Sequence, residues 1–339
     1  MGGLAHIMDY RGVLTPYGIF GGAFVETHVK YIISLFGLTA KGVNREKFGF
    51  LVATDQGSVA LQKSNTTEEN VEAILFQHEV KEFLYREGFD QTDRFYVTEK
   101  NLPYYKTSDD VYTASLTFAA PKVDFAKKQD FLTVVEHLGK MHKILMGANF
   151  AHKPKRRQEA IPPQKALENL ATHRKKLMKA GKFSEFDMLF LRGYEKFAPH
   201  ISSVSIAGGA LGDNNYICHN LLKEENIYMA DRPIFSNFAT AGYGHYLSDL
   251  TYMVKRYLKA EPDGDLPLAD IFGAYKAGHA EADINKDFFT AKLLYPDKFI
   301  KIARDYYSKN RSFAPKAYLA RMEESLARGN ALDGYIQKQ

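Results

Sequence analysis

The sequence predicts an α+β protein of two lobes, with a small antiparallel-sheet N-lobe followed by a larger, mainly helical C-lobe. Three observations predict this class: two alternating segments around a tight turn, an amphipathic helix directly after them, and helical periodicity through most of the second half. The chain has 339 residues, more than one hydrophobic core usually holds. We expect a first helix and the smaller lobe over residues 1–120, and the helical lobe over 121–339.

In the first lobe, a helix is expected over residues 25–37, and the segment 47–64 alternates apolar and polar residues around Asp-Gln-Gly at 55–57. This turn sequence favours a tight hairpin of two strands. The following segment, 66–90, opens with two threonines and two glutamates and ends near Gly88, which is typical of a capped helix. Further β-like runs follow at 94–98, 103–107 and 111–118.

The second lobe begins with a helical period at 128–148, and another helix is expected at 185–201. Three short apolar runs bounded by turn residues predict brief strands among the helices, at 215–222, 226–230 and 233–238. Helical segments then close the chain, at 247–260, 299–309 and 316–329. This order matches the protein-kinase-like architecture, although the pattern alone leaves an unrelated α+β domain as an alternative.

Composition limits the classes of function. No apolar run approaches 18 residues, so no membrane span is expected, and no signal peptide is recognisable, so we expect a cytoplasmic protein. The single cysteine, Cys218, excludes an internal disulfide framework. A basic run at 152–182 raises nucleic-acid binding as a hypothesis, but a solvated helix face with a basic loop is the simpler interpretation. Its cations are Lys153, Lys155, Arg156, Arg157, Lys165, Arg174, Lys175, Lys176, Lys179 and Lys182.

Six fragments resemble, in order, the spore-coat CotS family, including its YutH-type members, within the aminoglycoside-phosphotransferase branch of kinase-like proteins. They are GSVALQKSNTTEENVEAIL, EFLYREGFD, LPYYKTSDDVYTASLTF, VDFAKKQDFLTVVEHLGKMHK, YICHNLLKEEN and YLSDLTYMVKRYL. The resemblance covers residues 43–330 and implies the two-lobed kinase-like fold. It also implies coat or sporulation proteins as partners, and a location in the mother-cell cytoplasm or the spore coat.

In that family a loop resembling CHGDxxxxN is followed by a strand ending in Asp and a helix opening with Asp-Leu. Laid on residues 217–238 and the helix after them, His219 and Asn226 take the His and Asn positions. Leu221 stands where the resemblance places the catalytic Asp, and Asn237 where it places the metal-binding Asp. Asp249 takes the Asp of Asp-Leu.

The nucleotide-binding positions also depart from the family pattern. Gln62 falls at the N-lobe lysine position, and Lys63 follows one residue later, where strand alternation points it away from the cleft. Glu72 and Glu79 are the candidates for the glutamate that pairs with this lysine. The glycine loop would fall at 42–49, which is glycine-poor.

These substitutions predict a catalytically degenerate protein, a pseudokinase. Leucine cannot orient or deprotonate an acceptor hydroxyl, and an asparagine lacks the charge that favours Mg²⁺. We therefore expect no catalytic residues and no cofactor, with Asn226 and Asn237 as vestigial metal positions. Asp249 is expected to cap its helix and to brace the loop backbone, and His219 to be a scaffold residue. Cys218 is expected to be an apolar strand residue.

The alternative is an active small-molecule phosphotransferase that uses ATP and Mg²⁺ at a rebuilt site. Neighbouring acids would then have to replace the missing aspartates. The candidates are Asp213, Glu224, Glu225 and Asp231.

Overall fold

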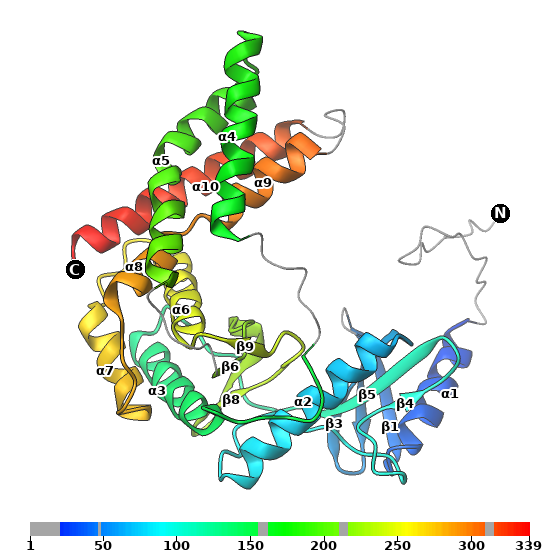
Figure 1. Ribbon diagram of the computed structural model, residues 1–339. Helices are drawn as coiled ribbons and strands as arrows, with labels where there is room; N and C mark the ends of the chain where they lie inside the picture. The colour runs from blue at the N-terminus through cyan, green and yellow to red at the C-terminus, as the bar shows by residue number, and fades with distance from the viewer. Residues whose placement is uncertain (1–20, 47–48, 155–161, 210–215, 309–314) are drawn as a thin grey trace, which may run out of the picture. The chain divides into compact units, whose positions relative to one another are not determined.

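The computed structural model describes residues 21–46, 49–154, 162–209, 216–308 and 315–339 (Figure 1). The chain divides into two compact units. The N-terminal unit comprises Met1–Phe83, Thr92–Ala119 and Phe150–Lys153, and the C-terminal unit comprises Leu84–Gln91, Ala120–Asn149 and Pro154–Gln339.

The N-terminal unit is built on a five-stranded antiparallel sheet of order β1-β2-β3-β5-β4. The predicted hairpin is confirmed: β2 and β3 are joined at 55–56, with Thr54 paired to Gly57. The β-like run at 94–98 contributes only one bridge, from Phe95 to Ser115. The elements are α1 (Gly21–Ser34), β1 (Ala40–Glu46), β2 (Gly49–Thr54), β3 (Gly57–Asn65), α2 (Glu68–Arg86), β4 (Tyr105–Lys106) and β5 (Asp110–Leu116).

The segment 42–49, where the resemblance places the glycine loop, contains the end of strand β1 at Glu46 and the start of β2 at Gly49. Val43 pairs with Val52 of β2 and packs against the apolar cluster under α1, which gives this segment a reason to be extended. Residues 47–48, where the chain passes from β1 to β2, lie outside the described residues.

Helices cover both faces of this sheet. Ile32 and Phe36 of α1 share an apolar cluster with Leu61 of β3, whereas Ile74 of α2 packs with Val111 of β5. Because side chains alternate along a strand, the residues of β3 on either side of Leu61 face the α2 side of the sheet. The two faces therefore assign opposite directions to consecutive residues of β3.

The C-terminal unit is mainly helical, with four very short strands between α5 and α6. The strands pair as two separate two-stranded ladders, β6 with β9 and β7 with β8. Its elements in chain order are α3 (Lys128–Leu145), α4 (Pro163–Ala180), α5 (Glu185–Gly209), β6 (Tyr216–Cys218), the 3₁₀ turn η1 (Glu224–Asn226), β7 (Ile227–Met229), β8 (Pro233–Phe235), β9 (Gly242–Gly244), α6 (Leu247–Ala260), α7 (Leu268–Gly278), α8 (Lys286–Leu294), α9 (Asp297–Ser308) and α10 (Pro315–Gln337).

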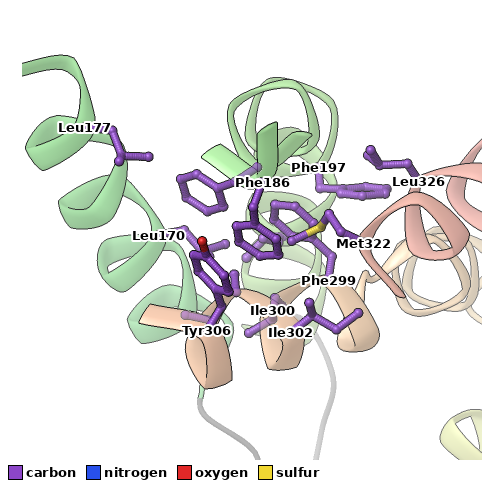
Figure 2. Packing of buried hydrophobic residues seen from close by; sticks show 14 residues of the cluster. Leu170, Leu177, Phe186, Phe197, Phe299, Ile300, Ile302, Tyr306, Met322 and Leu326 are labelled. Atoms are coloured by element: carbon purple, nitrogen blue, oxygen red, sulfur yellow. The ribbon is translucent and has the colours of Figure 1, made fainter. Parts of the chain in front are cut away.

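An aromatic core joins α4, α5, α9 and α10 (Figure 2). Phe186 of α5 stacks on Tyr306 of α9 with ring centroids 3.7 Å apart, and Met322 and Leu326 of α10 close the cluster. Leu170 and Leu177 of α4 point into the same core. The basic residues of α4 from 174 to 176 are exposed, so this part of the basic run lies on a solvent-facing side of the helix.

Helices α3 and α7 meet through two glycines. A Cβ on Gly139 would collide with the carbonyl oxygen of Tyr275, and a Cβ on Gly278 would collide with the carbonyl oxygen of Glu136. The two backbones are therefore in direct contact, an approach that only glycine permits. This contact fixes the position of each helix along the axis of the other.

Within the described residues, no helix is both long enough and apolar enough to cross a lipid bilayer.

Candidate functional site

The candidate loop lies in the C-terminal unit between β6 and β7, and β8 leads out of it again. Strand β6 ends at Cys218, the chain turns through Asn220, whose φ of 64° is left-handed, and η1 brings it into β7. Asn237, two residues beyond β8, is also left-handed, with a φ of 64°. Asparagine adopts this conformation more readily than most residues, because its short polar side chain bonds locally.

Asp249 holds the loop backbone. Its carboxylate accepts hydrogen bonds from the amide N–H of His219 at 2.6 Å and of Asn220 at 2.7 Å. The brace that the resemblance implies is therefore present. The expectation that Asp249 also caps its helix was wrong, because α6 begins at Leu247 and the capping position is Tyr246. The carboxylate turns toward the amides of the loop, 29 and 30 residues earlier in the chain.

His142 of α3 completes this brace and was missed by the sequence reasoning. Its Nε2 lies 3.2 Å from Oδ2 of Asp249, and its Nδ1 lies 2.8 Å from the hydroxyl of Tyr275 on α7. Burial alone would raise the pKa of the Asp249 carboxyl, but the hydrogen bond and charge of His142, together with His219 and the amide of Asn220, outweigh burial and lower it. Only the fold brings together three side chains so far apart in sequence.

His219 serves the scaffold on both sides of its ring. Nε2 donates to the carbonyl oxygen of Ser236 at 3.0 Å, so this nitrogen carries the proton. Nδ1 accepts from the amide N–H of Leu221 at 3.2 Å, which requires an unprotonated nitrogen. The two bonds assign a neutral imidazole whose acceptor is already engaged, as a structural histidine requires.

Leu221, Asn226 and Asn237 lie together where the resemblance places catalytic and metal-binding groups. The side-chain amide of Asn226 donates to the carbonyl oxygen of Leu221 at 2.9 Å, and its Oδ1 accepts from the amide of Asn237 at 3.3 Å. Asn226 is buried, with 7% of its surface exposed. The two asparagines are thus bonded to each other, and the group carries no net charge.

This donor set does not fit Mg²⁺. The ion is usually held by one or two carboxylates at near-ideal octahedral positions, and here the candidate ligands are two neutral amides. Oδ1 of Asn226 already accepts a hydrogen bond from the side-chain amide of Asn237, so it is engaged where a cation would need it as a ligand. The loop therefore offers a hydrogen-bonded closure at the position where the resemblance implies a metal.

The neighbouring acids are engaged elsewhere or lie too far along the hairpin. Glu224 pairs with Arg256 of α6, with Nε to Oε2 at 3.0 Å. Glu225 is 61% exposed and lies 3.5 Å from Lys223. Asp231 lies at the closed end of the β7–β8 hairpin, whereas Asn226 and Asn237 flank its open end, and three residues of strand span roughly 10 Å. Asp213 lies outside the described residues.

In the N-terminal unit, the two candidate lysine positions face opposite sides of β3. Lys63 shares the face of Leu61, lies opposite Tyr112 of β5, and pairs with Asp110 at 2.8 Å. Gln62 takes the other face, opposite Thr113. The alternation predicted from the sequence is therefore the geometry observed.

Among the described residues, neither candidate glutamate of α2 pairs with a lysine. Glu79 accepts from the amide N–H of His152 at 3.1 Å and lies 2.7 Å from Nδ1 of the same histidine. Glu72 is half-buried and has no hydrogen-bond or ion-pair partner within the described part of the chain.

A buried lysine on α2 was not anticipated. Lys81 is 1% exposed, lies 3.1 Å from Asp93, and sits over the ring of Phe95 at 3.9 Å. Burial lowers the pKa of its ammonium group, and the charge of Asp93 opposes that shift. The sequence gives no signal for it, because a lysine in an amphipathic helix is ordinarily exposed.

Three buried groups of the brace could also meet the geometric needs of a metal. Nε2 of His142, Sγ of Cys218 and a carboxylate oxygen of Asp249 lie within 4.8 Å of one another. The carboxylate, however, already accepts two backbone N–H groups and lies within hydrogen-bond distance of His142. Cys218 is fully buried in β6. The hydrogen-bonded brace accounts for this cluster.

Comparison with solved structures shows the fold. The chain is similar to an aminoglycoside phosphotransferase from Alicyclobacillus acidocaldarius, with a TM-score of 0.74 and 15% identity over 91% of this chain and 95% of that one. It is similar to the AMP-bound spectinomycin phosphotransferase, with a TM-score of 0.65 and 10% identity over 91% and 97%. It is also similar to a choline kinase from Streptococcus pneumoniae, with a TM-score of 0.54 and 14% identity over 92% and 100%.

No protein-family model matches the sequence, and no curated protein matches it. The structural similarity confirms the predicted kinase-like, aminoglycoside-phosphotransferase-type fold.

Proposed function

We propose that this chain is a catalytically degenerate kinase-like protein, which acts by binding and does not transfer phosphate. The observation that supports it is the neutral group formed by Leu221, Asn226 and Asn237. Phosphoryl transfer depends on a carboxylate that orients the acceptor and on cations that neutralise the phosphates. Loss of a general base alone commonly lowers the rate by about 10² to 10⁴.

The brace supports the same proposal from the opposite side. Asp249 retains its carboxylate and its bonds to the loop amides, so the backbone of the loop is still held. A braced loop whose implied metal positions hold two neutral asparagines is suited to presenting a surface or holding a ligand. It is not suited to gathering Mg²⁺ against a polyphosphate.

We place this binding function in sporulation, as a component of the spore coat or of the mother-cell cytoplasm, with other coat or sporulation proteins as partners. This part of the proposal rests on the resemblance of six ordered sequence fragments to the spore-coat CotS family. Localisation of a fluorescent fusion in sporulating cells tests it, and a fusion that is absent from both compartments would contradict it.

The experiment that tests the degenerate site compares phosphate release from ATP by the unmodified chain and by the double variant Leu221→Asp, Asn237→Asp. The unmodified chain is expected to show no Mg²⁺-dependent release above a buffer blank. Asn330→Asp, an exposed amide-to-acid change on α10, is the matched control and should behave like the unmodified chain. Mg²⁺-dependent turnover by the unmodified chain would overturn the proposal.

Thermal unfolding with ATP or ADP, with and without Mg²⁺, separates binding from turnover. A ligand at about 100 times its dissociation constant stabilises the native state by roughly 2.7 kcal/mol. We expect no Mg²⁺-dependent shift in the unmodified chain. A shift that requires Mg²⁺ would show that the metal still binds together with nucleotide, which the proposal excludes.

The second candidate is an active small-molecule phosphotransferase, favoured by the names of the similar structures, which are phosphotransferases and kinases. Glu225 is the acid best placed to serve it, because it is exposed beside Asn226, whereas Glu224 is bound to Arg256. This candidate predicts ATP turnover that Glu225→Gln abolishes. Unchanged turnover in Glu224→Gln, Glu225→Gln and Asp231→Asn would exclude this rebuilt site.

A further inference from the structure

A pocket of about 420 Å³ lies within the C-terminal unit, beside the candidate loop. Asn220 and Asp249 line one end of it, α6 forms one wall, and the α8–α9 connection and α10 form the others. This volume is within the range of small-molecule sites, roughly 300 to 1,000 Å³. The pocket therefore has room for a metabolite-sized ligand next to the loop.

The charged residues that line this pocket are mostly basic. Asp249 and Asp297 are the acids among the lining residues, and the carboxylate of Asp249 is already used by the loop amides and His142. Asp297 lies 3.1 Å from Lys255. The basic lining residues are Lys255, Arg256, Lys292, Lys298 and Arg328.

Most of these cations have an acidic partner. Arg256 is paired with Glu224, and Lys298 lies 2.9 Å from Glu324. Arg328 is different: one N–H donates to the carbonyl oxygen of Lys255 at 2.7 Å, but no carboxylate within the described ranges lies at ion-pair distance. A guanidinium has five N–H donors, so the bond to Lys255 uses only one of the five.

The surroundings of Arg328 make its other N–H donors important. Burial lowers the pKa of its guanidinium, and the neighbouring charge of Arg256 lowers it further, whereas the charges of Glu324 and Asp297 oppose these shifts. Arginine nevertheless stays charged in proteins, so two like charges persist beside one cavity. A planar guanidinium matches the geometry of carboxylate and phosphate groups, and an anion between the two arginines would relieve their repulsion.

We propose that this pocket binds a small organic anion, one that carries a phosphate group or several carboxylates, with Arg328 as its principal contact. The site adds a ligand class to the proposed function. It rests on that function in one respect only, which is that the bound anion is not phosphorylated. The guanidinium of Arg328, with the charge of Arg256 beside it, selects against cations of the same size.

Isothermal titration calorimetry of the full chain at low ionic strength tests the proposal. The probes are glycerol 3-phosphate, citrate and inorganic phosphate, with spermidine as the cationic probe, and no nucleotide is present. At least one of the two organic anions is expected to bind, more weakly as NaCl is added. Binding of glycerol 3-phosphate alone or of citrate alone distinguishes a phosphate ligand from a polycarboxylate.

The matched variants lie on the same helix. Arg328→Gln is expected to weaken binding of the preferred anion at least tenfold, because a charge-assisted pair is lost. Arg321→Gln, an exposed arginine two turns earlier on α10, should change it less than twofold. Circular dichroism of both variants establishes that they are folded. If Arg328→Gln does not fold, Lys298→Gln at the pocket and exposed Lys301→Gln on α9 form a second pair, with a two- to threefold loss expected for the first only.

Three results would overturn the anion site: no heat with either organic anion, equal binding by the variant and its control, or tighter binding of spermidine. Each is independent of the phosphate-release assay. Turnover with intact anion binding breaks only the proposed function, and absent turnover with absent anion binding breaks only this inference.

Discussion

Two neighbouring regions of the C-terminal unit treat acidic side chains in opposite ways. In the brace, Asp249 is 1% exposed and its carboxylate meets His142 and two loop amides. At the two positions where the resemblance implies metal ligands, Asn226 and Asn237 are neutral and are hydrogen-bonded to each other. A buried carboxylate is costly unless it is fully paired, so its presence in the brace indicates a structural role. The comparison separates what holds the loop from what would act through it.

The largest effect is expected from neutralising the brace. Asp249→Asn removes the buried charge opposite His142 and places an amide against two N–H donors, which should lower the free energy of unfolding by about 3 kcal/mol. Urea denaturation at pH 7 measures it. Asp263→Asn, an exposed aspartate in the α6–α7 connection, should change stability by less than about 0.5 kcal/mol. Equal, small effects of both variants would contradict the role assigned to the brace.

A smaller effect is expected from adding positive charge near the brace. Burial, followed by the charges of Lys292 and His142, lowers the pKa of His245 to about 4, against about 6.5 in the unfolded chain. Between these values the unfolded state binds more protons, so the free energy of unfolding should fall as the pH drops from about 6.5 toward 4.

Replacing this histidine tests that pH dependence. His245→Asn keeps a hydrogen-bond acceptor near the amide of Leu247 and should make the decline shallower by about 1.5 kcal/mol, roughly half of the full shift because the ring is partly exposed. Denaturation curves from pH 8 to pH 4.5 measure it. At pH 8 both proteins carry a neutral side chain, so the difference between them should be constant above pH 7.5. A difference that does not change with pH would count against the assignment.

The smallest effect on stability is expected at the implied metal positions, Asn226 and Asn237. Asn237→Asp puts a carboxylate oxygen against Oδ1 of Asn226 in place of an N–H donor, and should cost about 1 kcal/mol. Millimolar Mg²⁺ should restore part of this loss in the variant and none in the unmodified chain. Exposed Asn169→Asp on α4 serves as the control and should respond to neither change. Loss without any recovery in Mg²⁺ would show that the surrounding group cannot accept a cation even with one carboxylate restored.

Local patterns were enough to predict the hairpin, helix α2 and the short strands around the candidate loop. Each is determined by residues close in sequence, such as the turn at 55–57 or the alternation that separates Gln62 from Lys63. Spacing also placed Leu221 in the loop before β7 and Asn237 just after β8. Contacts between distant segments could not be read in this way. The bonds from Asp249 to His142 and the loop span 29 to 107 residues, and the buried Lys81 depends on how Asp93 returns beside α2.

The same limit explains the error at Asp249. Asp249 stands near the start of a helix, where a carboxylate usually caps the first turn, but the loop amides bind its carboxylate instead. Here a tertiary partner overrides the local preference for a cap.

The glycine contact between α3 and α7 has a consequence for sequence variation. Gly139 lies one turn before His142, and Gly278 lies one turn after Tyr275, so the two glycines set the spacing of the hydrogen bond between these side chains. In a saturation mutagenesis library, both positions should accept no residue but glycine, although neither lines the pocket. Even alanine would force the helices apart. A map of mutational tolerance would therefore mark these two backbone positions as strictly as any residue of the loop.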